Sequence, residues 1–96
     1  MAVTFVNTLD RSGDILVYFW GSSQASTTWG GEAMTRIADV DGKAAYTYNV
    51  PADATNIIFN NLTAQTDNIP FDGQPHVYRA VDALTDKGRY PFTIDG

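Results

Sequence analysis

The segment ILVYFWG, residues Ile15 to Gly21, decides the fold class. Successive side chains of a β-strand point to opposite faces of the sheet. One face of this segment carries apolar side chains suited to a core, from Ile15, Val17 and Phe19. The other face carries Leu16, Tyr18 and Trp20. The segment therefore predicts a strand that covers a core with one face and presents a Tyr and a Trp on the other.

Similar short apolar or alternating runs lie on both sides of this segment, and no long run has a helical period. We expect strands in VTFVNT (3–8), TRIADV (35–40), AAYTYNV (44–50), NIIFNNL (56–62), QTDNIPF (65–71), HVYRAV (76–81) and RYPFTI (89–94). About seven or eight strands in a chain of this length are typical of a sandwich. The sequence predicts an all-β fold, a two-sheet antiparallel β-sandwich of immunoglobulin-like architecture.

Turn residues predict how some of these strands connect. The runs VTFVNT and ILVYFWG flank the turn-rich LDRSGD, so we expect them to be neighbouring strands. Asp41-Gly42 tolerates the positive φ angles of a tight hairpin and joins TRIADV to AAYTYNV, which ends before Pro51. The segment AVDALTDKG (80–88) is also compatible with a helical turn closed by Gly88.

Composition limits the possible partners. A chain of 96 residues is long enough for one domain, so we expect a single domain over 1–96. It contains eleven acidic and six basic residues, for a net charge of -5. The basic residues are scattered, so we expect no nucleic-acid and no membrane partner. Cysteine is absent, which leaves a reducing cytosol and a secreted location both open. The N-terminal residues lack the form of a signal peptide, and no apolar run reaches the roughly 20 residues of a membrane span.

The segment GSSQASTTWGG (21–31) resembles a flexible linker in composition, yet it contains a Trp. Gly30 and Gly31 give the backbone freedom to present Trp29 in a tight loop. Because the loop begins one residue after Trp20, we expect Tyr18, Trp20 and Trp29 to form one aromatic surface. A sugar can rest its C–H face on such rings while its hydroxyls need polar neighbours. Candidate neighbours are Asn60, Asn61 and Gln65.

The order of YFW, TTWGGEAM, GKAAYTYNVPADATNIIFNN and QTDNI, over Val17 to Ile69, resembles carbohydrate-binding module family 26, the starch-binding modules of bacterial amylases. The resemblance implies a non-catalytic module that binds α-1,4-linked glucan through Tyr18, Trp20 and Trp29, with Gln65 as a hydrogen-bonding partner. The implied partners are starch, amylose, amylopectin and malto-oligosaccharides. It also implies a monomeric module of a larger multidomain protein that is secreted or held on the bacterial cell surface.

The sequence departs from the family pattern in places. Gly30 stands where the family has Pro, which removes a φ constraint next to Trp29 and predicts a more mobile ring. The second aromatic of the strand is often Tyr in the family and is Trp20 here, which favours stacking. The segment after residue 70 matches the family only loosely.

Catalytic and metal chemistry lack the residues they need. Glu32 is the sole Glu, and a glycosidase requires a second carboxylate across a cleft. His76 is the sole His, so a transition-metal site would lack ligands, although scattered Asp side chains leave a structural calcium open. We expect no enzyme activity, no catalytic or metal-ligating residues and no cofactor. The alternative reading is an immunoglobulin-like or fibronectin-like spacer or protein-interaction domain with Trp20 and Trp29 buried; a third is a module for another polysaccharide.

Overall fold

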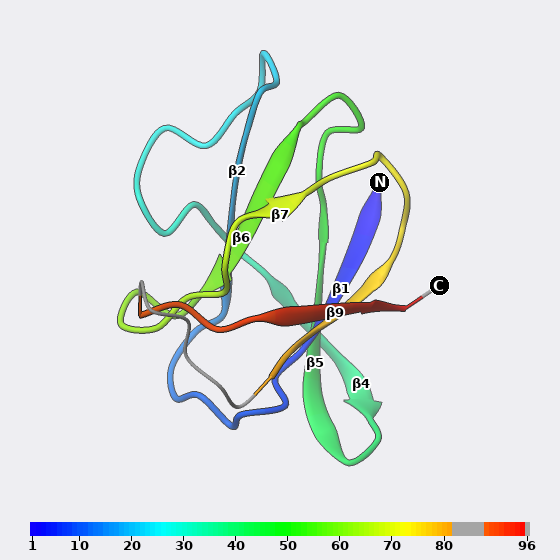
Figure 1. Ribbon diagram of the computed structural model, residues 1–96. Coiled ribbons are helices and arrows are strands. Elements are labelled where there is room, and N and C mark those ends of the chain that lie inside the picture. The colour runs from blue at the N-terminus through cyan, green and yellow to red at the C-terminus, as the bar shows by residue number, and fades with distance from the viewer. Residues whose placement is uncertain (82–87, 96) are drawn as a thin grey trace.

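The computed structural model describes residues 1–81 and 88–95, which form two β-sheets and no helix (Figure 1). The five-stranded sheet has the order β4 (Thr35–Val40), β5 (Lys43–Asn49), β1 (Ala2–Val6), β8 (Val77–Ala80), β9 (Phe92–Asp95). The four-stranded sheet has the order β3 (Glu32–Ala33), β2 (Leu16–Trp20), β6 (Asn56–Asn60), β7 (Ile69–Pro70). The predicted all-β, two-sheet sandwich is confirmed.

The core lies between the two sheets and is built by the alternation of each strand. Phe5 of β1 stacks on Phe59 of β6 with ring centroids 4.6 Å apart, and Tyr78 of β8 lies 5.3 Å from the same ring. On β2, Val17 and Phe19 are buried, as the alternation in ILVYFWG requires. Burying side chains of this size stabilises the fold by about 1.5–3 kcal/mol each. The inner face of β2 thus fixes the strand and leaves its outer face for another role.

The predicted hairpin at Asp41-Gly42 is confirmed. The dipeptide joins β4 to β5, and both residues have positive φ angles, 52° and 76°. Such a pair of angles is what a two-residue hairpin turn with the right-handed twist requires. Next to it, the pairing of β4 with β5 shifts register between Ile37 and Val40. The local turn signal was therefore sufficient for this connection.

The predicted pairing of the first two strands is wrong. Strand β1 pairs with β5 and with β8, and the β1–β8 pair is parallel, whereas β2 pairs with β3 and β6 in the other sheet. The connecting loop is held by the amide of Asn7, which donates to the Arg11 carbonyl and accepts from the Arg11 N–H. Both strands have an apolar face, and placing them in opposite sheets buries both faces against each other.

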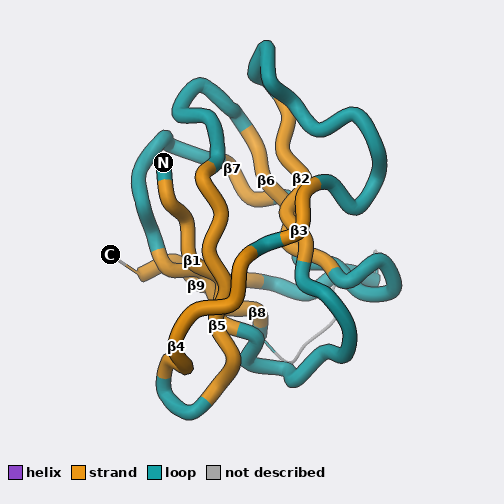
Figure 2. Tube along the Cα trace, turned by 180° about the vertical axis from the view of Figure 1, so that it is seen from behind, coloured by secondary structure: helices purple, strands orange, loops and turns teal. Residues whose placement is uncertain are grey.

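The chain passes between the sheets a second time between β3 and β4 (Figure 2). Met34 is the residue between these two strands; it is buried, and its N–H donates to the Ile15 carbonyl at 2.9 Å. The predicted strand QTDNIPF is reduced to Ile69–Pro70, with isolated bridges at Gln65 and Thr66. The possible helical turn in AVDALTDKG falls largely on residues 82–87, outside the described residues. No helix in the described part of the chain is long and apolar enough to cross a membrane.

Candidate binding site

Strand β2 places two aromatic side chains on the outer face of the four-stranded sheet. Tyr18 and Trp20 are half-buried. Val17 and Phe19, which alternate with them along the strand, are in the core. Ile58 of β6 is the register partner of Tyr18 and points outward, yet it is only 6% exposed. Ile58 is therefore a covered apolar side chain on the same outer face as Tyr18.

The loop after β2 lies at the upper left of Figure 1. It contributes a third ring, that of Trp29, which contacts the Tyr18 ring. The ring centroids of Tyr18 and Trp20 are 5.6 Å apart at an interplanar angle of 47°, and those of Tyr18 and Trp29 are 5.2 Å apart at 55°. Tyr18 thus lies between the two Trp rings. Trp29 is 46% exposed. The three rings therefore form one surface, as predicted, and they are tilted against one another instead of lying in one plane. We call Tyr18, Trp20 and Trp29 the platform.

Hydrogen bonds fold the loop back onto β2. The Ser26 N–H donates to the Phe19 carbonyl at 2.9 Å, and the Phe19 N–H donates to the Ser26 hydroxyl at 3.2 Å. The Gly31 N–H donates to the Thr28 carbonyl at 3.0 Å, which closes a turn with Trp29 and Gly30 at its centre. The loop that resembles a linker in composition is therefore a bonded structure.

Two glycines are required by the way this turn meets the sheet. Gly30 has φ +97°, a value that Pro cannot adopt, so the family's Pro would not fit this turn. Gly31 has φ +79°, and a Cβ on it would lie 2.2 Å from the Val17 carbonyl oxygen. The Gly30 carbonyl accepts a hydrogen bond from the buried Asn60 side chain at 3.1 Å. The turn that carries Trp29 is thus held on β2 by close packing and on β6 by Asn60.

The two asparagines expected at the sugar rim stabilise the scaffold instead. Asn60 is 4% exposed, and its Oδ1 also accepts the Leu62 N–H at 3.1 Å. The Asn61 side chain donates to the Ser12 carbonyl and accepts the Ala64 N–H. These amides are engaged within the protein. Nothing in the sequence indicates that Asn60, the first asparagine of FNN, holds the turn that carries Trp29.

Gln65 has a different position from these asparagines. It forms an isolated antiparallel bridge with Asn60, which in turn pairs with Leu16 of β2, so Gln65 shares the outer face with the platform. From strand spacing and rise, its Cα lies about 12 Å from that of Tyr18. Its backbone carbonyl accepts the Tyr90 N–H, and among the described residues its side-chain amide has no hydrogen-bond partner.

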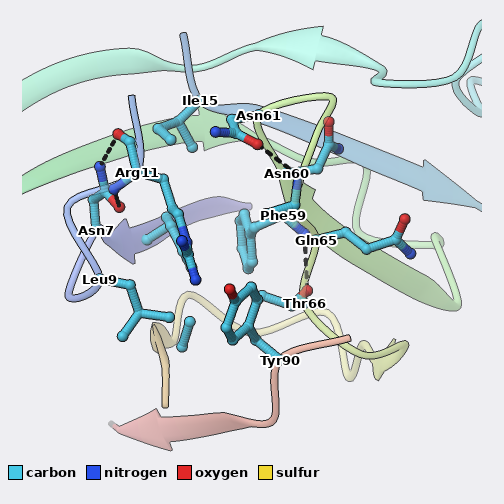
Figure 3. Close-up of a pocket in the computed structure, with 13 residues that line it drawn as sticks. Asn7, Leu9, Arg11, Ile15, Phe59, Asn60, Asn61, Gln65, Thr66 and Tyr90 are labelled. Atoms are coloured by element: carbon cyan, nitrogen blue, oxygen red, sulfur yellow. Dashed lines mark hydrogen bonds between the residues drawn. The ribbon is translucent and has the colours of Figure 1, made fainter. Parts of the chain in front are cut away.

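A small hollow opens at this end of the sandwich (Figure 3). Its volume is about 20 Å³, enough for a single water but not for a sugar ring. The Arg11 guanidinium lies in it, 4.3 Å over the Tyr90 ring, while the Gln65 side chain points away from it (Figure 3). The hollow is therefore a packing feature and is too small for a sugar.

The titratable residues considered for chemistry lie away from the platform. Glu32 is the register partner of Val17, so it leaves β3 on the side opposite to Tyr18; burial and the Glu32 charge raise the pKa of Tyr48. His76 pairs with Asp72 at 2.8 Å, and this hydrogen bond lowers the Asp72 pKa. Within residues 1–81 and 88–95, no group of three or more His, Asp or Glu side chains is placed to hold a metal ion.

The family model described as Starch-binding module 26 matches residues 3–71. The chain belongs to this family. The matched range includes all four strands of the sheet that carries the platform, together with the loop and Gln65. No curated protein and no solved structure matches the chain significantly.

Membership in the Starch-binding module 26 family agrees with the exposed ring cluster. The family is one of non-catalytic carbohydrate-binding modules, so the domain is not an enzyme. The alternative of a spacer with buried Trp residues does not describe this fold, because Trp29 is exposed and Trp20 is only half-buried. The family resemblance in the sequence and the exposed rings in the structure therefore point to the same surface.

Proposed function

We propose that Tyr18, Trp20 and Trp29 bind consecutive glucose units of an α-1,4-linked glucan, and that Gln65 hydrogen-bonds a sugar hydroxyl at the rim. The partners would be amylose, amylopectin and soluble malto-oligosaccharides. The observation that carries this proposal is the tilt of the platform, with interplanar angles of 47° and 55°. An α-1,4 linkage turns each glucose relative to the one before, so the chain curves around tilted rings. A straight β-1,4 glucan would match a flat row of rings.

Ring contact supplies most of the binding free energy in this proposal. The hydroxyls exchange bonds to water for bonds to protein, and their net gain is small. The C–H face of each glucose rests on a ring that already contacts a neighbouring ring and is carried by β2 or by the loop bonded to β2, so little ordering is needed on binding. With two or three stacked sugars, we expect a dissociation constant between micromolar and millimolar, roughly -4 to -8 kcal/mol.

Gln65 fits the rim because its side-chain amide offers both a donor and an acceptor. It reaches the outer face through its pairing with Asn60, whose own amide holds the Trp29 turn. A glucose at the Trp29 end of the platform would therefore lie nearest to Gln65. We expect its loss to weaken binding less than the loss of a ring.

We further propose that the whole chain, 1–96, is one module of a larger secreted or cell-surface protein. Strands β8 and β9 extend beyond the family match, and they support this boundary because β8 pairs directly with β1. Weak binding suits a monomeric module that is tethered to an amylase or repeated, since tethering to an insoluble polymer raises the effective concentration.

Calorimetric titration of maltoheptaose, with cellohexaose as the second ligand, tests the proposal. The Trp29→Ala variant should raise the dissociation constant for maltoheptaose by about tenfold or more, or 1.4 kcal/mol. The matched control is Ile94→Ala, because Ile94 is similarly exposed, at 45% against 46%, and lies in the other sheet. Equal affinity in the Trp29 variant, or equal affinity of wild type for both sugars, would contradict the proposal.

A further inference from the structure

Leu62 occupies a backbone position that disfavours leucine. Asn60 and Gln65 are paired, and a tight turn connects them. The Asn61 N–H closes this turn by donating to the Ala64 carbonyl at 3.1 Å, and Leu62 is the first of its two central residues. The φ angle of Leu62 is 77°. In two-residue hairpins with one positive φ at the first central position, that position is normally glycine. A bulky residue there is strained.

The same side chain is also unusually exposed. Leu62 is 61% exposed, which is the highest exposure of any large hydrophobic side chain in the described part of the chain. A residue that strains the backbone and leaves its apolar side chain in water does not improve the folding of a free domain. Strain that persists in a native fold is often found where a ligand binds.

The position of the side chain indicates which ligand covers it. A Cβ built on Gly30 would lie 2.6 Å from the Leu62 Cδ2, so this methyl group rests against the residue that follows Trp29. The Leu62 N–H and the Gly30 carbonyl are bonded to the same Asn60 side chain. Leu62 is therefore continuous with the Trp29 end of the platform and lies in the same short hairpin as Gln65.

We propose that Leu62 is a further ligand contact, and that its methyl groups pack against the C–H face of the α-glucan unit bound at the Trp29 end. This inference rests on the proposed function. The hairpin of residues 60–65 then gives one sugar an apolar contact from Leu62 and a polar contact from Gln65. The strain in the free protein is retained because the side chain is covered only in the complex.

The variants Leu62→Gly and Leu62→Asn separate binding from folding. Both residues tolerate a positive φ, so we expect the melting temperature to rise, by about 4 °C for Gly. The same variants should raise the dissociation constant for maltoheptaose by about fivefold, because an apolar contact is lost. A role in folding alone predicts unchanged affinity, and a variant that fails to fold is not expected when strain is removed.

A second measurement identifies direct contact. In the wild-type complex with maltoheptaose, we expect nuclear Overhauser effects between the Leu62 methyl groups and glucose ring protons. Their absence, with or without a change in affinity, would overturn the inference, and loss of affinity without them would make Leu62 a positioning residue for Trp29. If wild type binds, Trp29→Ala does not and Leu62→Gly binds as wild type does, the inference fails while the proposed function stands. If wild type does not bind maltoheptaose at all, both fail.

Discussion

A single methyl group added at Gly31 tests how the Trp29 turn is held. In Gly31→Ala, the new Cβ would lie 2.2 Å from the Val17 carbonyl oxygen and 2.7 Å from the Tyr18 Cα, both backbone atoms of β2. Gly13 offers a matched control, because it has the same φ of +79° but nothing within 4 Å of its built Cβ. The two variants differ in packing against β2 and share the cost of the positive φ.

The magnitude follows from these contacts. The positive φ should lower the free energy of unfolding by about 1 kcal/mol in both variants. At Gly31 the turn must also move by about 1 Å before the Cβ reaches the 3.4 Å of ordinary contact, and such overpacking costs about 1–3 kcal/mol more. For a domain of this size, each kcal/mol lowers the melting temperature by about 4–8 °C. We therefore expect Gly31→Ala to melt about 4–24 °C below Gly13→Ala.

Thermal unfolding by circular dichroism and calorimetric titration with maltoheptaose measure the two consequences. Gly13→Ala should bind as wild type does. Gly31→Ala should bind weakly even at temperatures where it is fully folded, because the displaced turn carries Trp29 away from Tyr18. Equal melting temperatures for the two variants would refute the close packing of the turn on β2. Wild-type affinity in Gly31→Ala would refute the claim that this packing places Trp29.

Other perturbations give further tests. Asn60→Ala removes two hydrogen bonds, one to the Gly30 carbonyl and one from the Leu62 N–H. We expect it to lower the free energy of unfolding by about 1–3 kcal/mol and to weaken maltoheptaose binding. Lower stability with unchanged affinity would limit the role of Asn60 to folding. Burial raises the pKa of Tyr78 to about 12 from 10.0. Its stabilising effect is full below pH 10 and is lost as the pH rises toward 12, at up to about 1.4 kcal/mol per pH unit, and Tyr78→Phe should remove this loss in pH-dependent unfolding curves. The hydrogen bond with His76 lowers the pKa of Asp72 below 3.8. Wild type should exceed Asp72→Ala in melting temperature above that pH and lose the difference in more acidic solution; a difference that persists at the lowest pH would contradict the pairing.

Local patterns were enough to predict the fold class and the position of the rings. The alternation in ILVYFWG separates Val17 and Phe19 from Tyr18 and Trp20, because a strand has only two faces. The Asp41-Gly42 turn depends on two φ angles that the dipeptide itself favours. The exposed Trp29 followed from a polar loop with two glycines. Each of these predictions needs only residues that are close in sequence.

Features that depend on distant residues were not predictable from the sequence. The pairing of β1 with β5 and β8 is set by which apolar faces pack across the core, and the connecting loop carries no signal for it. The role of Asn60 depends on the position of Gly30, thirty residues earlier in the chain. The strain at Leu62 arises from a turn whose ends are paired strands, so the residue type alone gives no indication of it.

Binding of a curved glucan by the platform can be measured by titrating the tryptophan fluorescence of the unmodified chain with maltoheptaose and, separately, with cellohexaose. We expect a saturable change with maltoheptaose alone, because the tilted platform of Tyr18, Trp20 and Trp29 fits a curved glucan. An equal response to both sugars, or none to either, would contradict it.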